Sequence, residues 1–303
     1  MKYCEFLDCI QNQTKSTAGK GGKVTVNHII KNNGRELDGL VIMEENSHIS
    51  PTIYLNDYYE QYINGRRLDS IVNEIITIYK ENKNKISINT GLFNDFNSIK
   101  DMIVYRLVNY QQNKKLLESV PHKKFLDLAV IFYCLLEQQC DGNATALIYN
   151  SHMEMWGISE CDIFKAAVKN TPRLLKSDIR PMSELIRRMM PLGIQDEDML
   201  EYCEDSSCLD DQMYVLTNES KIHGAACILY EDVLRDFSNK LGRDLYILPS
   251  SIHEVILLPK TETFNIDCLN SMIHEVNCDG VSDDEILSDH VYKYNRVSGM
   301  IEM

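Results

Sequence analysis

The chain has 303 residues, of which 44% are hydrophobic and 25% are charged. These proportions are typical of soluble globular proteins, and they exclude collagen-like, coiled-coil and wholly disordered chains. The formal net charge is −14, and the acidic excess falls in residues 191–303, which hold 23 acidic and 7 basic side chains. Because lysine and arginine bind the nucleic-acid backbone, we expect no direct binding of nucleic acid.

The N-terminal part predicts helices beside a β-hairpin. Strands are expected at residues 24–30 and 37–43, and Asn33-Gly34 between them favours a tight turn because both residue types tolerate positive φ. Apolar residues recur at helical spacing over residues 2–11, 55–63 and 68–79. Tyrosines 54, 58, 59 and 62 fit either core packing, which their spacing favours, or a contact surface.

The middle of the chain predicts a mixture of strands and helices. Residues 99–108 fit either a helix or a strand. Ser159, with Asp162 three residues later, predicts a capped helix that runs to about residue 169. The other expected elements are strands at 126–136 and 144–149, a helix over 111–120 and a helix that begins at Pro181.

Residues 195–211 hold eight acidic side chains and no basic one. Because like charges repel, we interpret this segment as an exposed acidic linker. It would separate an N-terminal α+β domain, residues 1–194, from an acidic C-terminal α+β domain, residues 212–303.

The C-terminal domain predicts a mostly antiparallel sheet with helices on one face, which is the α+β class. The expected strands are residues 214–217, 225–229, 245–248, 255–258 and 291–294. The expected helices are residues 231–241 and 266–277.

The ten cysteines contain no CxxC pair, and three of them lie in apolar stretches, so we expect reduced thiols and a cytoplasmic protein. The longest apolar run, residues 128–136, is far shorter than the ~20 residues of a membrane-spanning helix. Residues 17–23 lack the spacing of a phosphate-binding loop, and residues 279–289 lack that of a calcium loop. We therefore expect no cofactor, no metal and no membrane association.

Four residues near the ends of neighbouring expected strands form the candidate site, namely His223, Ser250, His253 and Glu254. Serine, histidine and glutamate are the residue types of a nucleophile, a base and its orienting acid. Adjacent residues in a turn usually bond to nearby backbone groups, so turn chemistry is the favoured interpretation.

Four segments resemble an uncharacterised bacterial family, a domain of unknown function common in gut Firmicutes. They are residues 32–40, 51–56, 214–218 and 247–255. The resemblance spans nearly the whole chain and implies a cytoplasmic bacterial protein. Because the family has no known activity, the resemblance assigns no functional residues.

The sequence thus favours a non-catalytic cytoplasmic protein that acts through protein contacts, as an adaptor or regulator. Its acidic part would suit a basic protein partner. Two alternatives stay open. A hydrolase or metal-assisted enzyme would need His223, Ser250, His253 and Glu254 to converge, and a small-ligand sensor would need an apolar cavity between the domains. The sequence does not predict the oligomeric state.

Overall fold

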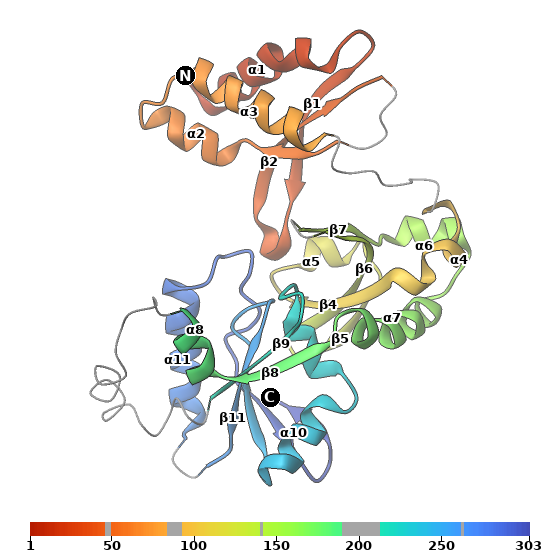
Figure 1. Cartoon of the computed structure of the whole chain (residues 1–303), viewed down its shortest axis with the longest axis vertical. Coiled ribbons are helices and arrows are strands. Elements are labelled where there is room, and N and C mark those ends of the chain that lie inside the picture. Colours follow the sequence, from red (N-terminus) through yellow and green to blue (C-terminus); the bar gives the residue numbers. More distant parts are fainter. Residues whose placement is uncertain (46–49, 84–92, 140–141, 190–212, 262–263) are drawn as a thin grey trace. The chain divides into compact units, whose positions relative to one another are not determined.

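The computed structural model describes residues 1–45, 50–83, 93–139, 142–189, 213–261 and 264–303 (Figure 1). The chain forms two compact units. The smaller unit comprises residues 1–98 and 136–144, and the larger unit comprises residues 99–135 and 145–303.

The smaller unit packs helices against a three-stranded antiparallel sheet of order β1-β2-β3. Its elements in chain order are α1 (Tyr3–Thr14), β1 (Lys23–Ile30), β2 (Glu36–Met43), β3 (Thr52–Tyr54), α2 (Asn56–Ile63) and α3 (Leu68–Asn82). The predicted hairpin is confirmed, since Asn33 and Gly34 both take positive φ, 57° and 71°.

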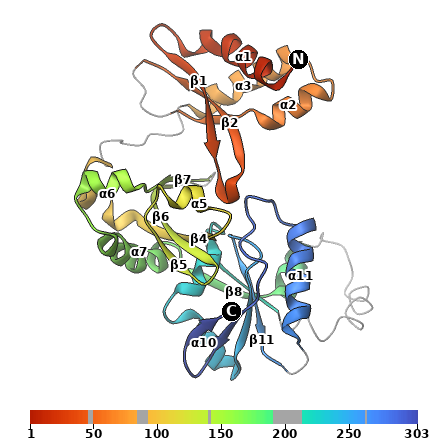
Figure 2. The ribbon, with the colours of Figure 1, turned by 180° about the vertical axis from the view of Figure 1, so that it is seen from behind.

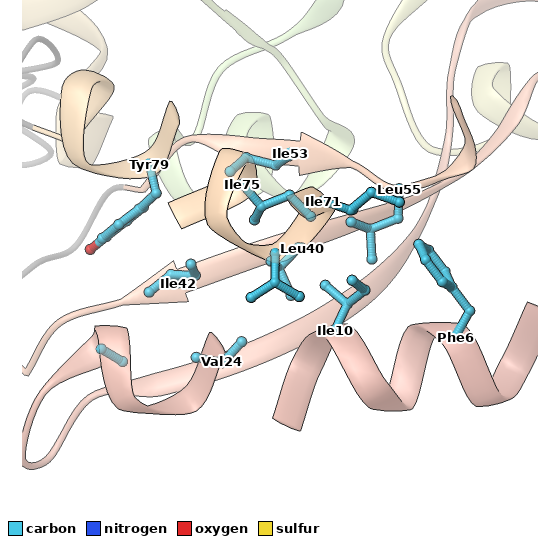
Figure 3. Close-up of a cluster of buried hydrophobic side chains, with 12 residues drawn as sticks. Phe6, Ile10, Val24, Leu40, Ile42, Ile53, Leu55, Ile71, Ile75 and Tyr79 are labelled. Atoms are coloured by element: carbon cyan, nitrogen blue, oxygen red, sulfur yellow. The ribbon is translucent and has the colours of Figure 1, made fainter. Parts of the chain in front are cut away.

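The core of the smaller unit lies between α1, α3 and the sheet. Figure 3 shows Phe6 and Ile10 of α1 in the same cluster as Leu40 of β2, with Ile71 and Ile75 of α3. All five side chains are fully buried. Three of the four tyrosines, those at 58, 59 and 62, pack against this core while staying partly exposed.

A sheet of order β4-β6-β5, with β7 paired to β6, belongs to the larger unit except at residues 136–144, where β6 ends and β7 begins. Its strands are β4 (Ile103–Asn109), β5 (His122–Phe125), β6 (Leu128–Gln139) and β7 (Gly142–Leu147). The ambiguous residues 99–108 thus yield a strand from Ile103, because β4 pairs with β6 along its whole length. The short helices are α4 (Phe96–Ile99), at the start of this region, and α5 (Lys114–Leu117), where we expected a longer helix.

Helices follow this sheet in the chain. They are α6 (Asn150–Trp156), α7 (Glu160–Leu174) and α8 (Met182–Met189). The predicted cap of α7 is confirmed, since Ser159 Oγ accepts from the Asp162 backbone N–H and the Asp162 carboxylate accepts from the Ser159 N–H.

The second sheet of the larger unit has six antiparallel strands in the order β13-β12-β10-β11-β9-β8. They are β8 (Ser177–Pro181), β9 (Tyr214–Asn218), β10 (Leu245–Leu248), β11 (Val255–Pro259), β12 (Tyr292–Asn295) and β13 (Met300–Glu302). The α+β class and the antiparallel C-terminal sheet are therefore confirmed.

Two helices cover this sheet, α10 (Val233–Leu241) and α11 (Ile266–Asp279) (Figures 1 and 2). Leu269 and Ile273 of α11 pack with Tyr246 on one face. By register, Tyr214 lies on the other face, where its ring contacts Phe237 of α10 at 4.9 Å between centroids. Helices thus lie on both faces of this sheet, whereas we expected them on one face.

The strand expected at 225–229 is wrong, because these residues belong to a 3₁₀ helix, η6 (Gly224–Leu229). Both edges of β9 are already paired, with β8 and β11, so no edge is left there for another strand. A short apolar run does not by itself distinguish a buried strand from a buried helix. Gly224 is required where η6 meets β9, since a Cβ there would lie 2.2 Å from Thr217 Oγ1.

The domain division differs from the one that we expected. The acidic linker at 195–211 lies outside the described residues. The strands on either side of it, β8 and β9, pair from Ser177↔Asn218 to Pro181↔Tyr214. The strand β8, from the expected domain 1–194, is therefore the edge strand of the sheet in the expected domain 212–303. The division between the two compact units falls instead after residue 98.

Asp127, in the turn between β5 and β6, connects that turn to the segment that enters β12. Its carboxylate accepts hydrogen bonds from Ser288 Oγ, at 2.6 Å, and from the Tyr292 hydroxyl. His290 Nδ1 lies 3.3 Å from Asp127 Oδ2. Burial, reinforced by the charge of Asp127, raises the pKa of Tyr292, so this phenol stays a donor.

We expect Asp127→Asn to lower the free energy of unfolding by about 1.5–3 kcal/mol, because hydrogen bonds to a charged acceptor are replaced by weaker ones. Urea unfolding measures the change, with Asp279→Asn, at an exposed position, as the matched control. Equal effects of the two substitutions would contradict a structural role for the Asp127 carboxylate.

Candidate functional site

The structure brings together two of the four residues singled out from the sequence. The imidazole rings of His223 and His253 are stacked, with centroids 5.7 Å apart and planes 10° apart. Glu254 is exposed, and His253 Nε2 instead lies 3.4 Å from the carboxylate of Glu285. The backbone carbonyl of Ser250 accepts from the N–H of Leu287. The four residues thus do not converge on one point.

The His253 turn is held mostly by local bonds. Ser251 Oγ accepts from the backbone N–H of His253 at 3.0 Å, and Thr217 Oγ1 donates to the His253 carbonyl at 2.8 Å. His253 Nδ1 accepts from the backbone N–H of His223 at 3.4 Å. Both ring nitrogens of His253 therefore face a partner, and the turn chemistry expected from the sequence describes Ser251 and His253 well.

Two residues that sequence reasoning missed complete the cluster around His223. Arg106 of β4 donates from Nη1 to His223 Nε2 at 3.1 Å. Tyr133 of β6 meets the His223 ring edge to face, with centroids 5.5 Å apart. Register places Tyr133 opposite Val104, so Tyr133 lies on the same sheet face as Arg106. The available signal was one arginine inside the otherwise apolar strand of residues 103–108.

We call Arg106, Tyr133 and His223 the Arg106 cluster. Each member carries a solvent-inaccessible polar atom without a hydrogen-bond partner among the described residues, namely Arg106 Nε, Tyr133 Oη and His223 Nδ1. Because His223 Nε2 accepts from Arg106, the neutral ring carries its proton on Nδ1. All three atoms are then donors, and what they lack is an acceptor.

Charge in the cluster is uncompensated. Burial lowers the pKa of Arg106, and the groups that oppose this shift are Tyr133 and Tyr149, not carboxylates. Burial also lowers the pKa of His223 well below its usual value, with Arg106 and His253 adding to the effect. Among the salt bridges of the described residues, none includes Arg106. A half-buried guanidinium beside a neutral imidazole therefore makes the cluster electropositive.

Backbone strain positions His223. Both His223 and Lys221 adopt the left-handed conformation, with φ of 53° and 54°. Such residues cost about 1–3 kcal/mol each and persist where the surrounding structure holds them. Asn218 does so here, donating from Nδ2 to the Ile222 carbonyl at 2.8 Å and accepting from the Ile222 N–H at 3.3 Å.

The cluster is not sealed from solvent. Arg106, His223 and His253 all keep intermediate exposure, although specific atoms of the first two are buried.

Two further observations apply to the described part of the chain. It contains no group of three or more histidine, cysteine or acidic side chains placed to hold a metal ion. None of its helices combines the length and apolar character needed to cross a bilayer.

The fold and site define a class, an α+β protein with antiparallel sheets whose larger unit carries a half-buried, electropositive arginine–histidine cluster. The chain belongs to the DUF5688 family of unknown function, whose family model matches residues 3–296. This confirms the expected membership of an uncharacterised family, while the bacterial source stays a prediction. No curated protein and no solved structure matches the chain.

The depressed pKa of His223 predicts how stability depends on pH. In the folded chain His223 stays neutral, whereas in the unfolded chain it takes up a proton near pH 6.5. Below that pH the unfolded state binds more protons, so stability falls as pH falls. The expected loss is about 1 kcal/mol between pH 6.5 and 5.5.

Urea unfolding across this pH range tests the point, with His223→Gln compared with His274→Gln, whose side chain is 70% exposed. We expect His223→Gln to flatten the acid side of the curve and His274→Gln to leave it unchanged. A curve that keeps its slope in His223→Gln would show that another group is responsible.

Proposed function

We propose that this protein is a non-catalytic regulatory protein of the cytoplasm that senses a small anion at the Arg106 cluster. The observation that carries the proposal is the half-buried guanidinium of Arg106, whose Nε is solvent-inaccessible and which has a neutral histidine and no carboxylate as its partner. Two more buried donors, on Tyr133 and His223, lack an acceptor beside it.

Energetics favour an anion as the missing partner. A desolvated charge without a partner lowers the stability of the folded state by several kcal/mol, and a bound ion of opposite charge would offset this cost. Hydrogen bonds from a cation to an anion are roughly twice as strong as neutral ones, and a guanidinium presents a planar fork that matches carboxylate and phosphate oxygens. An anion beside Arg106 would compensate its charge and give Arg106 Nε the acceptor that it lacks.

The chemistry of the neighbouring groups supports sensing over hydrolysis. A hydrolase needs an activated nucleophile next to its base. Ser251 Oγ is bonded to the backbone of His253, and burial raises the pKa of the Cys227 thiol to about 12, so this thiol stays protonated at neutral pH. His223 Nε2 is held by Arg106.

The regulatory part of the proposal rests on where an anion would bind. It would contact Arg106 on the sheet and His223 on the strained loop that leads into η6. Binding would thus restrain a loop that begins in a strained conformation. The cytoplasmic location is supported by the described cysteines, which are all free thiols.

Calorimetric titration of the full chain with inorganic phosphate, sulfate or acetate, in an otherwise cationic and zwitterionic buffer, tests anion binding. We expect wild type to bind at least one of these anions. Arg106→Met should weaken that binding by about tenfold or more, and Tyr133→Phe should weaken it less.

The matched control is Arg243→Met, which removes an exposed arginine elsewhere in the larger unit and should leave the affinity unchanged. Arg106→Met should keep or raise the unfolding free energy, since an apolar side chain replaces an unpaired buried charge, so a loss of binding cannot be ascribed to unfolding. Absence of binding of all three anions by wild type would contradict the proposal.

The charge distribution supports a basic protein as the partner that this protein would regulate, since residues 191–303 carry a net charge of −16. Chemical cross-linking in the native host at low and at high salt tests this. We expect basic partners whose cross-links disappear at high salt, and partners that are insensitive to salt would contradict it.

A further inference from the structure

A pocket of about 170 Å³ lies on the face of the β4–β6–β5 sheet opposite to the Arg106 cluster. Tyr105 lines it, and Tyr105 precedes Arg106 on β4, so the two side chains project to opposite faces of the sheet. The lining residues are Tyr105, Lys123, Lys124, Phe125, Val130, Phe164, Val168 and Leu229. All of them belong to the larger unit.

The walls of the pocket are apolar and aromatic. Phe164 projects from α7 and stands edge to face against Phe132 of β6, with centroids 6.3 Å apart. Val168, one turn further along α7, is 46% exposed although it is a large apolar side chain. A cavity of about 150 Å³ with apolar walls is large enough to bind benzene. The pocket therefore fits an apolar body about the size of one aromatic ring.

One ammonium group defines the polar end of the pocket. Lys123 Nζ lies 4.5 Å from the centroid of the Phe164 ring, so this charge sits at an aromatic wall of the pocket. The neighbouring Lys124 Nζ lies over the ring of Tyr110 instead, at 5.0 Å. No acidic residue is among those that line the pocket, and among the described residues neither lysine forms a salt bridge.

We propose that this pocket is a second ligand site, which binds a small aromatic carboxylate with its ring between Phe164 and Val130 and its carboxylate on Lys123. The charge of Lys123 supplies the preference for an anion, and the size of the pocket limits the apolar part to a single ring. The site uses no residue of the Arg106 cluster and goes beyond the proposed function.

The experiment titrates the full-length protein with phenylacetate and, separately, with phenylacetamide, its neutral isostere, while methyl NMR signals of Val130, Val168 and Leu229 are followed. We expect phenylacetate to shift these signals and to bind about tenfold more tightly than phenylacetamide. Lys123→Met should remove that preference. Lys240→Met is the matched control, because Lys240 is an exposed residue of the larger unit that does not line the pocket, and it should keep the preference.

Lys123 and Lys240 are both exposed, so neither substitution should affect folding. The proposal is overturned if the two ligands bind wild type equally, if Lys240→Met acts like Lys123→Met, or if the shifted methyl groups lie elsewhere. Arg106→Met separates this site from the Arg106 cluster. It should leave phenylacetate binding intact, and loss of that binding would place the ligand at the cluster instead.

Discussion

The central constraint on the larger unit is the burial of Arg106 within a strand that pairs along its whole length. The register from Ile103↔Cys134 to Asn109↔Leu128 assigns each side chain of β4 to one face of its sheet. The strand buries apolar side chains on both faces, so a shift of register would disturb the packing of both, and Arg106 keeps its position. The guanidinium therefore stays where its charge is partly desolvated, and its neighbours must accommodate it.

Those neighbours accommodate the guanidinium only in part. His223 accepts one hydrogen bond, and its own pKa is lowered by the charge that it contacts and by burial. The histidine is also held in a strained backbone conformation that Asn218 stabilises. A purely structural arginine would be expected to have a carboxylate as its partner, because an unpaired buried charge is costly. Strain, unpaired donors and uncompensated charge at one place together favour a binding role.

The sequence predicted those parts of the fold that local chemistry decides. The Asn33-Gly34 turn needs only two residues that tolerate positive φ, and the Ser159 cap needs only a side chain three residues away. The parts that it did not predict depend on distant pairing. β4 is a strand because β6 lies beside it, and η6 is not a strand because β8 and β11 already flank β9.

The candidate site shows the same division between local and distant information. His223 and His253 were recognised as neighbours because both follow strands of one sheet. Glu285 stands where Glu254 was expected because the Ser251↔Ile286 bridge brings a distant loop beside the His253 turn. Tyr133 was missed because it fits the pattern of an ordinary core strand, and Arg106 was missed because residues 99–108 fit either a helix or a strand, so its face could not be assigned. An arginine inside an apolar run was the one sign of an unusual site.

The most direct test is a crystal structure of the full chain grown with selenate, whose selenium scatters anomalously and whose oxygens accept hydrogen bonds as those of sulfate do. We expect an anomalous peak at the Arg106 cluster, with a selenate oxygen within hydrogen-bond distance of Arg106 Nε. An ordered water at that position, with selenate absent or bound only elsewhere, would contradict the assignment of the cluster as an anion site.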